Sequence, residues 1–451
     1  MSKELEDTLW KAANKLRGSL SSSQYKDVVL GLVFLKHVSD EHWKFLADNA
    51  KSPEINRLAD EAMLAMMAAN PAFADLLPLL YHTVDQRRLG ELVELLDSAR
   101  FDGAGDLMGE VYEYFLGNFA RAEGQRGGEF FTPPSVVRLI IEVLRPSNGR
   151  VYDPCCGSGG MFVQTEKFIA ARDGERPEIY GQEGVEQTWR MAKMNLAVHG
   201  IDNTELARGD TFVQDQHAGT QMDYVLANPP FNIKDWARDT DDPRWRFGVP
   251  PAGNANFAWI QHILSKLAPG GTAGVVMANG SMSSNASGEK AIRAGIVDAD
   301  LLSCLVALPA HLFRSTGIPV CVWFFGMSKG ERSGQVLFID ARGLGHLVNR
   351  AERVLTDNEI ASIGGTYNAW YAAKDSSYQD VPGFCRSVPI DEIRAADYVL
   401  TPGRYVGAPA GEADGEAVGD KVARLTKDLL AALDESALLD RTVREQLERL
   451  R

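Results

Sequence analysis

The chain has 451 residues, 45% of them hydrophobic and 24% charged, a composition typical of a globular protein with about two to four domains. Its formal charge of −14 excludes strong unaided binding to DNA, because such binding depends on lysine and arginine side chains that neutralise phosphates. Either the substrate is not DNA, or a partner supplies much of the DNA affinity.

Five cysteines, two of them adjacent, form neither a disulfide framework nor a zinc-ligand spacing. A reducing, cytoplasmic location and no metal site are therefore expected. The N-terminus has no apolar signal region, and its longest apolar stretch, residues 28–35, is too short to span a bilayer. No membrane partner is expected.

Residues 1–120 are predicted to form an all-helical domain. Apolar residues recur at helical spacing from Leu9 to Leu16, and strand-like alternation is hard to find. The serines that begin at Ser21 are a suitable N-terminal cap for an apolar helix over Val28–Val38.

From about residue 148 to 330, short β-rich runs alternate with helical segments such as Gln187–His199 and Phe257–Leu267. The expected strands are Arg150–Tyr152, Glu178–Gly181, Asp223–Ala227, Thr272–Ala278, Leu301–Leu308 and Pro319–Phe325. This alternation predicts a doubly wound α/β sheet, in which ligands bind beyond the carboxyl ends of the strands.

The catalytic domain is expected over 121–405, although 331–405 has a mixed pattern. Residues 407–419 are rich in Gly and Ala and indicate a linker within the tail 406–451. An amphipathic helix with a leucine stripe follows. It packs either on its own domain or on a partner, and the linker leaves both interpretations open.

A glycine-rich loop, Asp153-Pro154-Cys155-Cys156-Gly157-Ser158-Gly159-Gly160, follows the first expected strand of the sheet. It matches neither the dinucleotide fingerprint nor the Gly-Lys-Ser/Thr ending of a phosphate-binding loop. Its acidic residue at the strand end instead suits a ligand with an amino group. The two cysteines are interpreted as loop fillers, because no histidine lies nearby in sequence to activate them.

Two further acidic residues end strands. Glu183 follows the second strand, where a carboxylate can bond ribose hydroxyls, and Asp210 is a candidate to bond an adenine amino group. Upstream, the block 128–134 places two aromatic residues before a Thr-Pro helix start. These aromatics fit a ligand wall, and they also fit a hydrophobic staple at the helix start.

The tetrapeptide Asn228-Pro229-Pro230-Phe231 follows the apolar strand 222–227. Asn228 offers a hydrogen-bond acceptor, the prolines stiffen the turn, and Phe231 has a flat face for a planar ring. The tetrapeptide could hold an exocyclic amino group of a base, and it is also explained as a Pro-Pro turn with Phe231 in the core.

These blocks in this order resemble S-adenosylmethionine-dependent, amino-methylating DNA methyltransferases, and more closely the modification (methylase) subunit of type I restriction-modification systems. The resemblance covers nearly the whole chain. It rests on residues 9–18, 128–134, 153–160, Glu183, Asp210, 228–231, 270–271, 312–313, 316–319, 338–342 and 404–406.

The resemblance implies the fold of this methyltransferase family and a role for each block. Contacts to the methyl donor would come from Glu129, Phe130, Phe131, Thr132, Pro133 and Pro134. Its methionine part would meet Asp153, Ser158, Gly159 and Gly160, in the loop that includes Gly157. Glu183 would contact its ribose and Asp210 its adenine. The target adenine would be held by Asn228, Pro229, Pro230 and Phe231.

The resemblance also implies the reaction, which is methyl transfer to N6 of an adenine flipped out of double-stranded DNA. The loop 232–250 contains Trp236, Trp245 and Phe247 among basic residues, but its four cations are offset by four aspartates. A modest phosphate contact is the most that this loop predicts.

Sequence recognition is therefore assigned to a separate specificity subunit, flanked in the family by two methylase subunits. The tail 407–451 is expected to help dock that subunit, and a restriction subunit is a further candidate partner. Two alternatives remain open from the residues: a methyltransferase acting on a protein glutamine amide, and a non-catalytic scaffold subunit.

Overall fold

The computed structural model describes residues 9–10, 20–74, 76–98, 107–123, 132–286, 288–313, 317–349, 352–372, 377–408, 422–434, 436 and 439. The chain forms two compact units, Met1–Val406 and Gly407–Arg451. None of the described helices is long and apolar enough to cross a membrane.

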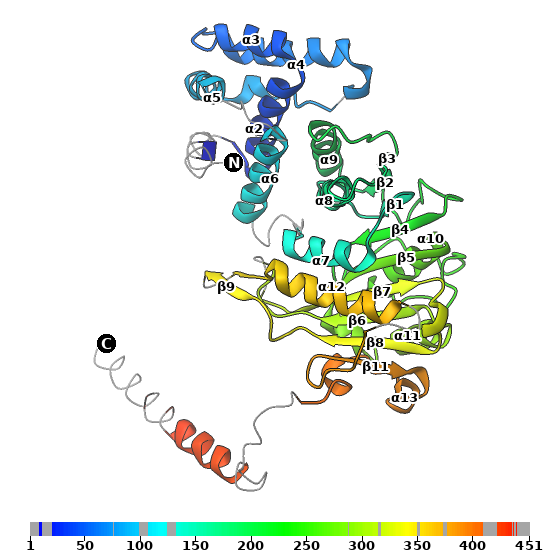
Figure 1. Ribbon diagram of the computed structural model, residues 1–451. Coiled ribbons are helices and arrows are strands. Elements are labelled where there is room, and N and C mark those ends of the chain that lie inside the picture. Colours follow the sequence, from blue (N-terminus) through cyan, green and yellow to red (C-terminus); the bar gives the residue numbers. More distant parts are fainter. Residues whose placement is uncertain are drawn as a thin grey trace. The chain divides into compact units, whose positions relative to one another are not determined.

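The N-terminal part of the first unit is helical, as predicted (Figure 1). Its helices are α2 (Ser22–Val38), α3 (Asp40–Asp48), α4 (Ile55–Ala69), α5 (Gln86–Ser98) and α6 (Leu107–Glu123), with 3₁₀ turns η1 (Pro71–Phe73) and η2 (Tyr81–Thr83). Ser21 caps α2 in a capping box, because its hydroxyl accepts from the Gln24 N–H and the Gln24 side chain accepts from the Ser21 N–H. The cap was predicted, but α2 begins well before Val28.

Nine strands form one sheet within the described residues, in the order β11-β8-β6-β7-β5-β4-β1-β2-β3. The strands are β1 (Arg150–Asp153), β2 (Glu178–Glu183), β3 (Leu206–Arg208), β4 (Met222–Ala227), β5 (Leu267–Ala278), β6 (Leu302–Ala307), β7 (Val320–Gly326), β8 (Gln335–Asp340) and β11 (Cys385–Pro389). Most neighbours are parallel, including β4-β1-β2-β3. The predicted doubly wound, mostly parallel fold is confirmed.

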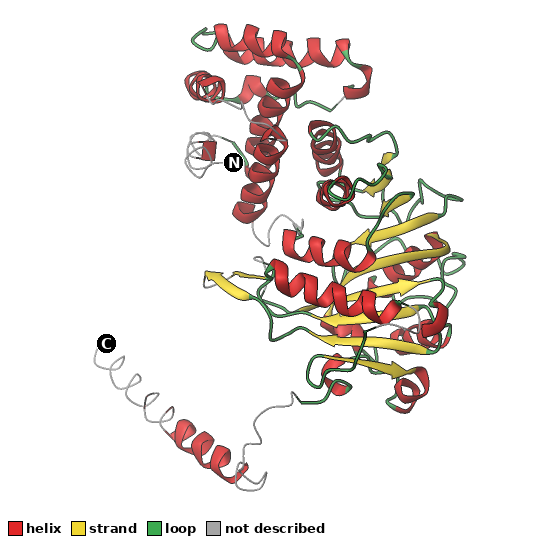
Figure 2. Ribbon diagram, viewed as in Figure 1, coloured by secondary structure: helices red, strands yellow, loops and turns green. Residues whose placement is uncertain are grey.

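Helices cover both faces of this sheet (Figure 2). One face packs against α7 (Pro134–Leu144), α8 (Gly160–Ala170), α9 (Glu186–Val198) and α12 (Asp357–Tyr371). The other packs against α10 (Asn256–Lys266), α11 (Glu289–Asp298) and α13 (Ile390–Ala395). Helix α9 has a second role, since Met191, Met194 and Val198 belong to the core of the helical domain. The two parts of the first unit therefore share a packed interface.

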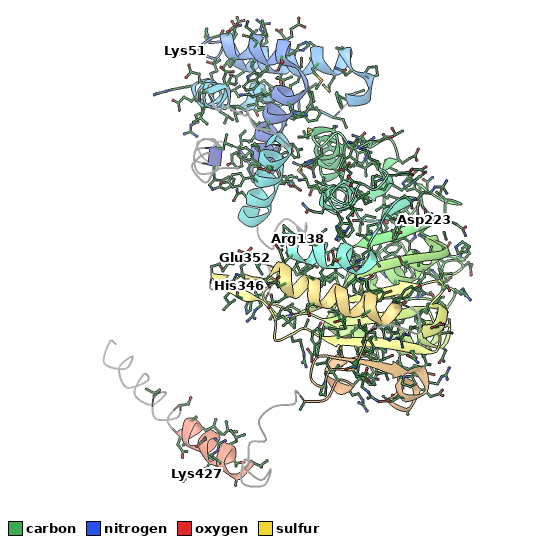
Figure 3. All side chains as sticks on the ribbon, viewed as in Figure 1. Lys51, Arg138, Asp223, His346, Glu352 and Lys427 are labelled. Carbon is green, nitrogen blue, oxygen red and sulfur yellow. The ribbon has the colours of Figure 1, made fainter. Side chains whose placement is uncertain are left out.

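The segment with the mixed pattern completes the sheet. Strand β8 adds parallel to β6, and β11 adds antiparallel to β8 at the edge. A hairpin of β9 (His346–Asn349) and β10 (Glu352–Val354) projects from the sheet, with His346 and Glu352 labelled on it in Figure 3. Short 3₁₀ turns are η4 (Asn279–Met282), η5 (Gly330–Arg332) and η6 (Pro402–Arg404).

Residues 422–434 of the second unit are helical, as the sequence predicts. Along this helix, Val422, Leu425, Leu429 and Leu433 are all exposed. Their spacing of three and four residues places them on one face.

Candidate functional site

The site is built at the carboxyl edge of four parallel strands. Strand β1 ends at Asp153 and β2 at Glu183, while Asp210 follows β3 and Asn228 follows β4. Because β4, β1, β2 and β3 are neighbours in this order and run the same way, their ends bring all four polar side chains to one edge.

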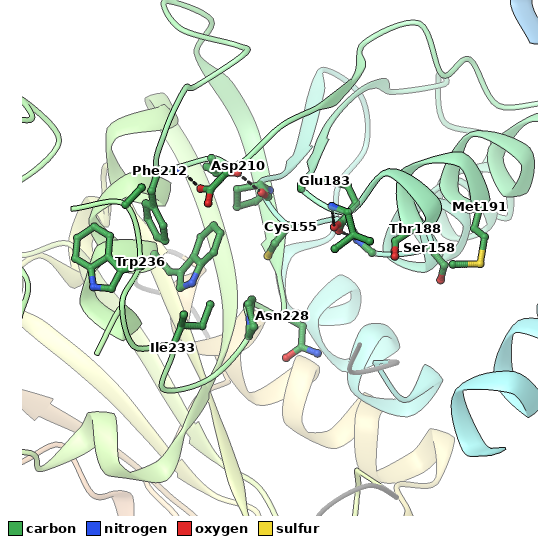
Figure 4. A pocket seen from close by; sticks show the side chains of 18 of the residues that line it. Cys155, Ser158, Glu183, Thr188, Met191, Asp210, Phe212, Asn228, Ile233 and Trp236 are labelled. Atoms are coloured by element: carbon green, nitrogen blue, oxygen red, sulfur yellow. Dashed lines mark hydrogen bonds between the residues drawn. The ribbon is translucent and has the colours of Figure 1, made fainter. Parts of the chain in front are cut away.

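A cavity of about 410 Å³ lies at this edge (Figure 4). Its lining includes Lys26, Leu116, Cys155, Gly157, Ser158, Glu183, Val185, Thr188, Met191, Asp210, Phe212, Asn228, Pro230, Ile233, Trp236 and Trp259. A smaller space of about 70 Å³ is lined by Thr132, Pro134, Asp153 and Gly160, and it shares Leu116, Cys155, Gly157, Ser158 and Asn228 with the first. The shared walls make the two spaces parts of one site.

The glycine-rich loop is held in place by the side chain of Glu183. Gly157 and Gly159 have φ of 55° and 77°, in the left-handed region that favours glycine. The Gly157 N–H donates to Glu183 Oε2 at 3.0 Å, and Glu183 Oε1 accepts from the Val185 N–H at 2.8 Å. Glu183 thus fixes the loop while it lines the cavity. Helix α8 begins at Gly160, so its N-terminus faces the smaller space.

Asp153 is a buried carboxyl group, with only 3% of its surface exposed. Burial raises the pKa of Asp153 to about 7, although Oδ1 accepts from the Cys155 N–H at 3.0 Å. Burial also raises the pKa values of the Cys155 and Cys156 thiols well above their usual range, which agrees with their interpretation as loop fillers.

One end of the cavity is aromatic. The Phe212 ring centroid lies 4.9 Å from that of Trp236 and 4.3 Å from that of Trp259. Asp210 lies beside this wall, and its Oδ1 accepts from the Phe212 N–H at 2.8 Å. Figure 4 shows Phe212, Trp236 and Asp210 on one side of Glu183. Flat apolar surfaces next to an acceptor suit a planar base with an exocyclic amino group.

The structure places the two tryptophans of the 232–250 loop inside the protein. Trp236 and Trp245 are only 8% and 7% exposed, and both pack in the cluster around Phe212. Arg244 pairs with Asp242 at 2.5 Å and donates to the Thr211 carbonyl at 2.7 Å. These side chains brace the wall of the cavity, and this structural role accounts for both tryptophans.

Asn228 stands where the two spaces meet. Its Nδ2 donates to Thr132 Oγ1 at 2.9 Å. Its Oδ1 is buried and has no hydrogen-bond partner among the described residues. A buried acceptor without a partner costs free energy, so this oxygen is prepared to accept a hydrogen bond from a ligand.

The rest of the tetrapeptide frames this acceptor. Pro230 lines the cavity, whereas Pro229 is buried and, like Phe231, lies outside the lining of both spaces. Phe231 is half-buried and its ring lies edge-on to Phe313, with centroids 6.3 Å apart. Asn232 follows with φ of 55°, and its N–H donates to Asn256 Oδ1 at 2.9 Å.

Of the upstream block, Glu129, Phe130 and Phe131 lie outside the described residues. Thr132 and Pro134 line the smaller space, and α7 begins at Pro134 directly after Pro133. The predicted helix start is therefore confirmed, and it also delivers Thr132 to Asn228.

Sequence reasoning missed several lining residues. Phe212, Ile233 and Trp259 were not singled out, and neither were Lys26 and Leu116 of the helical domain. The many aromatic residues between 232 and 259 could have indicated an aromatic wall of the site. No local pattern indicated that α2 and α6 would reach a site at the edge of the sheet.

Known proteins match the chain over most of its length. A family model of N-6 DNA methylases matches residues 103–414, and a model of the HsdM N-terminal domain matches residues 5–63. The methylase subunit of the type I restriction enzyme HindI from Haemophilus influenzae is 44% identical over 87% of this chain and 92% of its own length.

The MjaIX methylase subunit from Methanocaldococcus jannaschii, also of a type I restriction enzyme, is 34% identical over 99% of this chain and 91% of its own length. A crystal structure of a type I restriction-modification system methyltransferase subunit from Streptococcus thermophilus aligns with a TM-score of 0.75 at 25% identity. That alignment covers 90% of this chain and 100% of the other.

Proposed function

Because this chain belongs to the N-6 DNA methylase family, among the methylase subunits of type I restriction enzymes, we propose that the cavity beside Asn228 is where it methylates adenine. The chain is an adenine-specific DNA methyltransferase. The observation that carries the placement is the buried, unpartnered Oδ1 of Asn228 at the junction of the two spaces.

S-adenosylmethionine is the donor that this site suits. Its adenine would lie against Phe212 and Trp236 with its amino group near Asp210, and its ribose hydroxyls would bond Glu183. Its methionine part would extend toward the 153–160 loop, where the buried carboxyl of Asp153 suits an ammonium group. When bound, the donor supplies an electrophilic methyl group on a sulfonium.

The protein's contribution is then to hold the target nitrogen. Adenine N6 is a weak nucleophile because its lone pair is delocalised into the ring. Asn228 Oδ1 and the Pro229 carbonyl would accept its two hydrogens, which favours a pyramidal nitrogen with its lone pair aimed at the methyl group. Phe231 would stack on the flipped base. No covalent enzyme intermediate is required.

Site recognition is proposed to come from a separate specificity subunit, with two methylase subunits beside it. The net charge of −14 and the internal ion pair of Arg244 argue against strong DNA binding by this chain alone. The leucine face of residues 422–434 is the proposed docking element for that subunit. A restriction subunit is a further proposed partner, and we propose that the reaction takes place in the cytoplasm.

Co-expression with a candidate specificity subunit tests this function. We expect N6-methyladenine in the host genome at one sequence motif, and only when both chains are present. A catalytically active chain that methylates glutamine in protein and leaves DNA unmodified would overturn the assignment, as would donor binding without any turnover.

Donor binding should depend on pH through Asp153. Burial holds the pKa of this carboxyl near 7, and an ammonium group beside it favours the ionised form. Affinity for S-adenosylmethionine should therefore rise by about tenfold between pH 6 and pH 8, with proton release on binding below pH 7. Calorimetry in buffers of different ionisation enthalpy measures both. The Asp153→Asn variant should show a flat profile, and a slope retained in that variant would contradict the role of Asp153.

A further inference from the structure

Lys26 is a lysine of the helical domain that lines the cavity at the edge of the sheet. Only 4% of its surface is exposed. The next residue, Asp27, fixes this turn of α2 against the first turn of α9, because the Gln187 amide donates to both of its carboxylate oxygens at 2.9 Å. The position of Lys26 beside the cavity is thus set by a contact between the two parts of the first unit.

Acidic side chains outnumber basic side chains around the cavity. Lys26 is the only lysine or arginine among the described residues that line either space. The carboxylates among them are Glu113, Asp153, Glu183, Asp210 and Asp235. S-adenosylmethionine carries two positive groups, the sulfonium and the ammonium, and one negative group, the α-carboxylate. The acidic residues suit the first two, and only Lys26 offers a charge that matches the third.

Lys26 also lies toward the appropriate end of the donor. Asp27, the residue after Lys26, is bonded to Gln187 at the start of α9, and the residue after Gln187, Thr188, lines the same cavity. Figure 4 shows Ser158 and Thr188 on the side of Glu183 away from Phe212. With the donor's adenine at the aromatic wall and its ribose at Glu183, its amino-acid end extends toward this side.

We propose that the Lys26 ammonium binds the α-carboxylate of S-adenosylmethionine, so that the helical domain supplies part of the donor site. This inference rests on the donor placement proposed above. Helix α2 reaches the donor only while it is packed on α9. Donor binding and the packing of the helical domain on α9 therefore stabilise each other.

The test compares two ligands on the full-length chain by calorimetry: S-adenosylmethionine and its decarboxylated analogue. In Lys26→Met, affinity for S-adenosylmethionine should fall by about 10- to 100-fold, the range for a lost charge-assisted hydrogen bond. Affinity for the decarboxylated analogue should stay within about twofold of the unmodified protein, because the group that Lys26 binds is already missing. Lys26→Arg should recover part of the affinity for S-adenosylmethionine.

Lys36→Met is the matched control on the same helix. Lys36 donates to the Leu96 carbonyl at 2.5 Å inside the helical domain and does not line the cavity. The Lys36→Met variant should bind S-adenosylmethionine and its decarboxylated analogue with unchanged affinity. Thermal melting should show that all variants are folded. Equal loss of both ligands in Lys26→Met would overturn the proposal, as would no loss of either. Failure of the unmodified chain to bind S-adenosylmethionine would instead contradict the donor site itself.

Discussion

Replacing Asn228 with alanine is expected to lower the rate of methyl transfer by about 10²- to 10³-fold or more, while donor affinity changes by less than about threefold. The substitution removes Oδ1, the buried acceptor that has no partner among the described residues. The donor keeps its proposed contacts to Glu183 and Asp210. Single-turnover transfer of tritiated methyl groups in the assembled complex measures the first effect, and calorimetry measures the second.

Thr132→Val is the matched control for this variant. It removes the group that accepts from Asn228 Nδ2 and leaves Oδ1 in place. A loss of about tenfold or less is expected, because the asparagine is only less firmly oriented. Near-normal turnover by Asn228→Ala would contradict the proposed role of Asn228, and an equal loss in both variants would assign the effect to the orientation of the loop.

Deleting residues 407–451 is expected to abolish assembly with the specificity subunit and leave the first unit folded. The tail is a separate compact unit, and its described helix exposes Leu425, Leu429 and Leu433 on one face. Burial of three leucines against a partner contributes several kcal/mol, so affinity should fall by at least about 100-fold. Size-exclusion chromatography with light scattering measures the complex, and calorimetry checks that the truncated chain still binds the donor.

A triple Leu→Ser variant at these three positions should reproduce the deletion. Its control is Arg424→Ser with Lys427→Ser, since helical spacing places both on the opposite face of the same helix (Figure 3 labels Lys427). An intact complex from the truncated chain would show that the specificity subunit docks elsewhere.

Much of the fold follows from local pattern. The sequence predicts the strands from β1 to β7 other than β3 within two residues at each end, except that β5 begins at Leu267 and not at Thr272, because their buried, apolar runs are bounded by turn residues. The start of α2 and the short strand β3 were harder to predict from the sequence. The sequence does not predict strands β8 and β11, because their strand conformation depends on pairing with distant segments. Strand β8 pairs with β6, and β11 pairs with β8 at the edge of the sheet.

The sequence by itself determined which chemistry this chain carries. Strands are predicted just before Asp153, Glu183 and Asn228, and Asp210 is interpreted as the end of a further strand. Parallel strands bring the residues at their carboxyl ends to one edge of the sheet. Only the tertiary structure decided what surrounds them. It turned Trp236 inward to form the wall of the cavity.

The tertiary structure also brought Lys26 from a separate helical domain to the cavity. Both outcomes depend on packing between segments far apart in the chain, such as α2 against α9. That packing is set by complementary surfaces, and no periodicity within one segment encodes it.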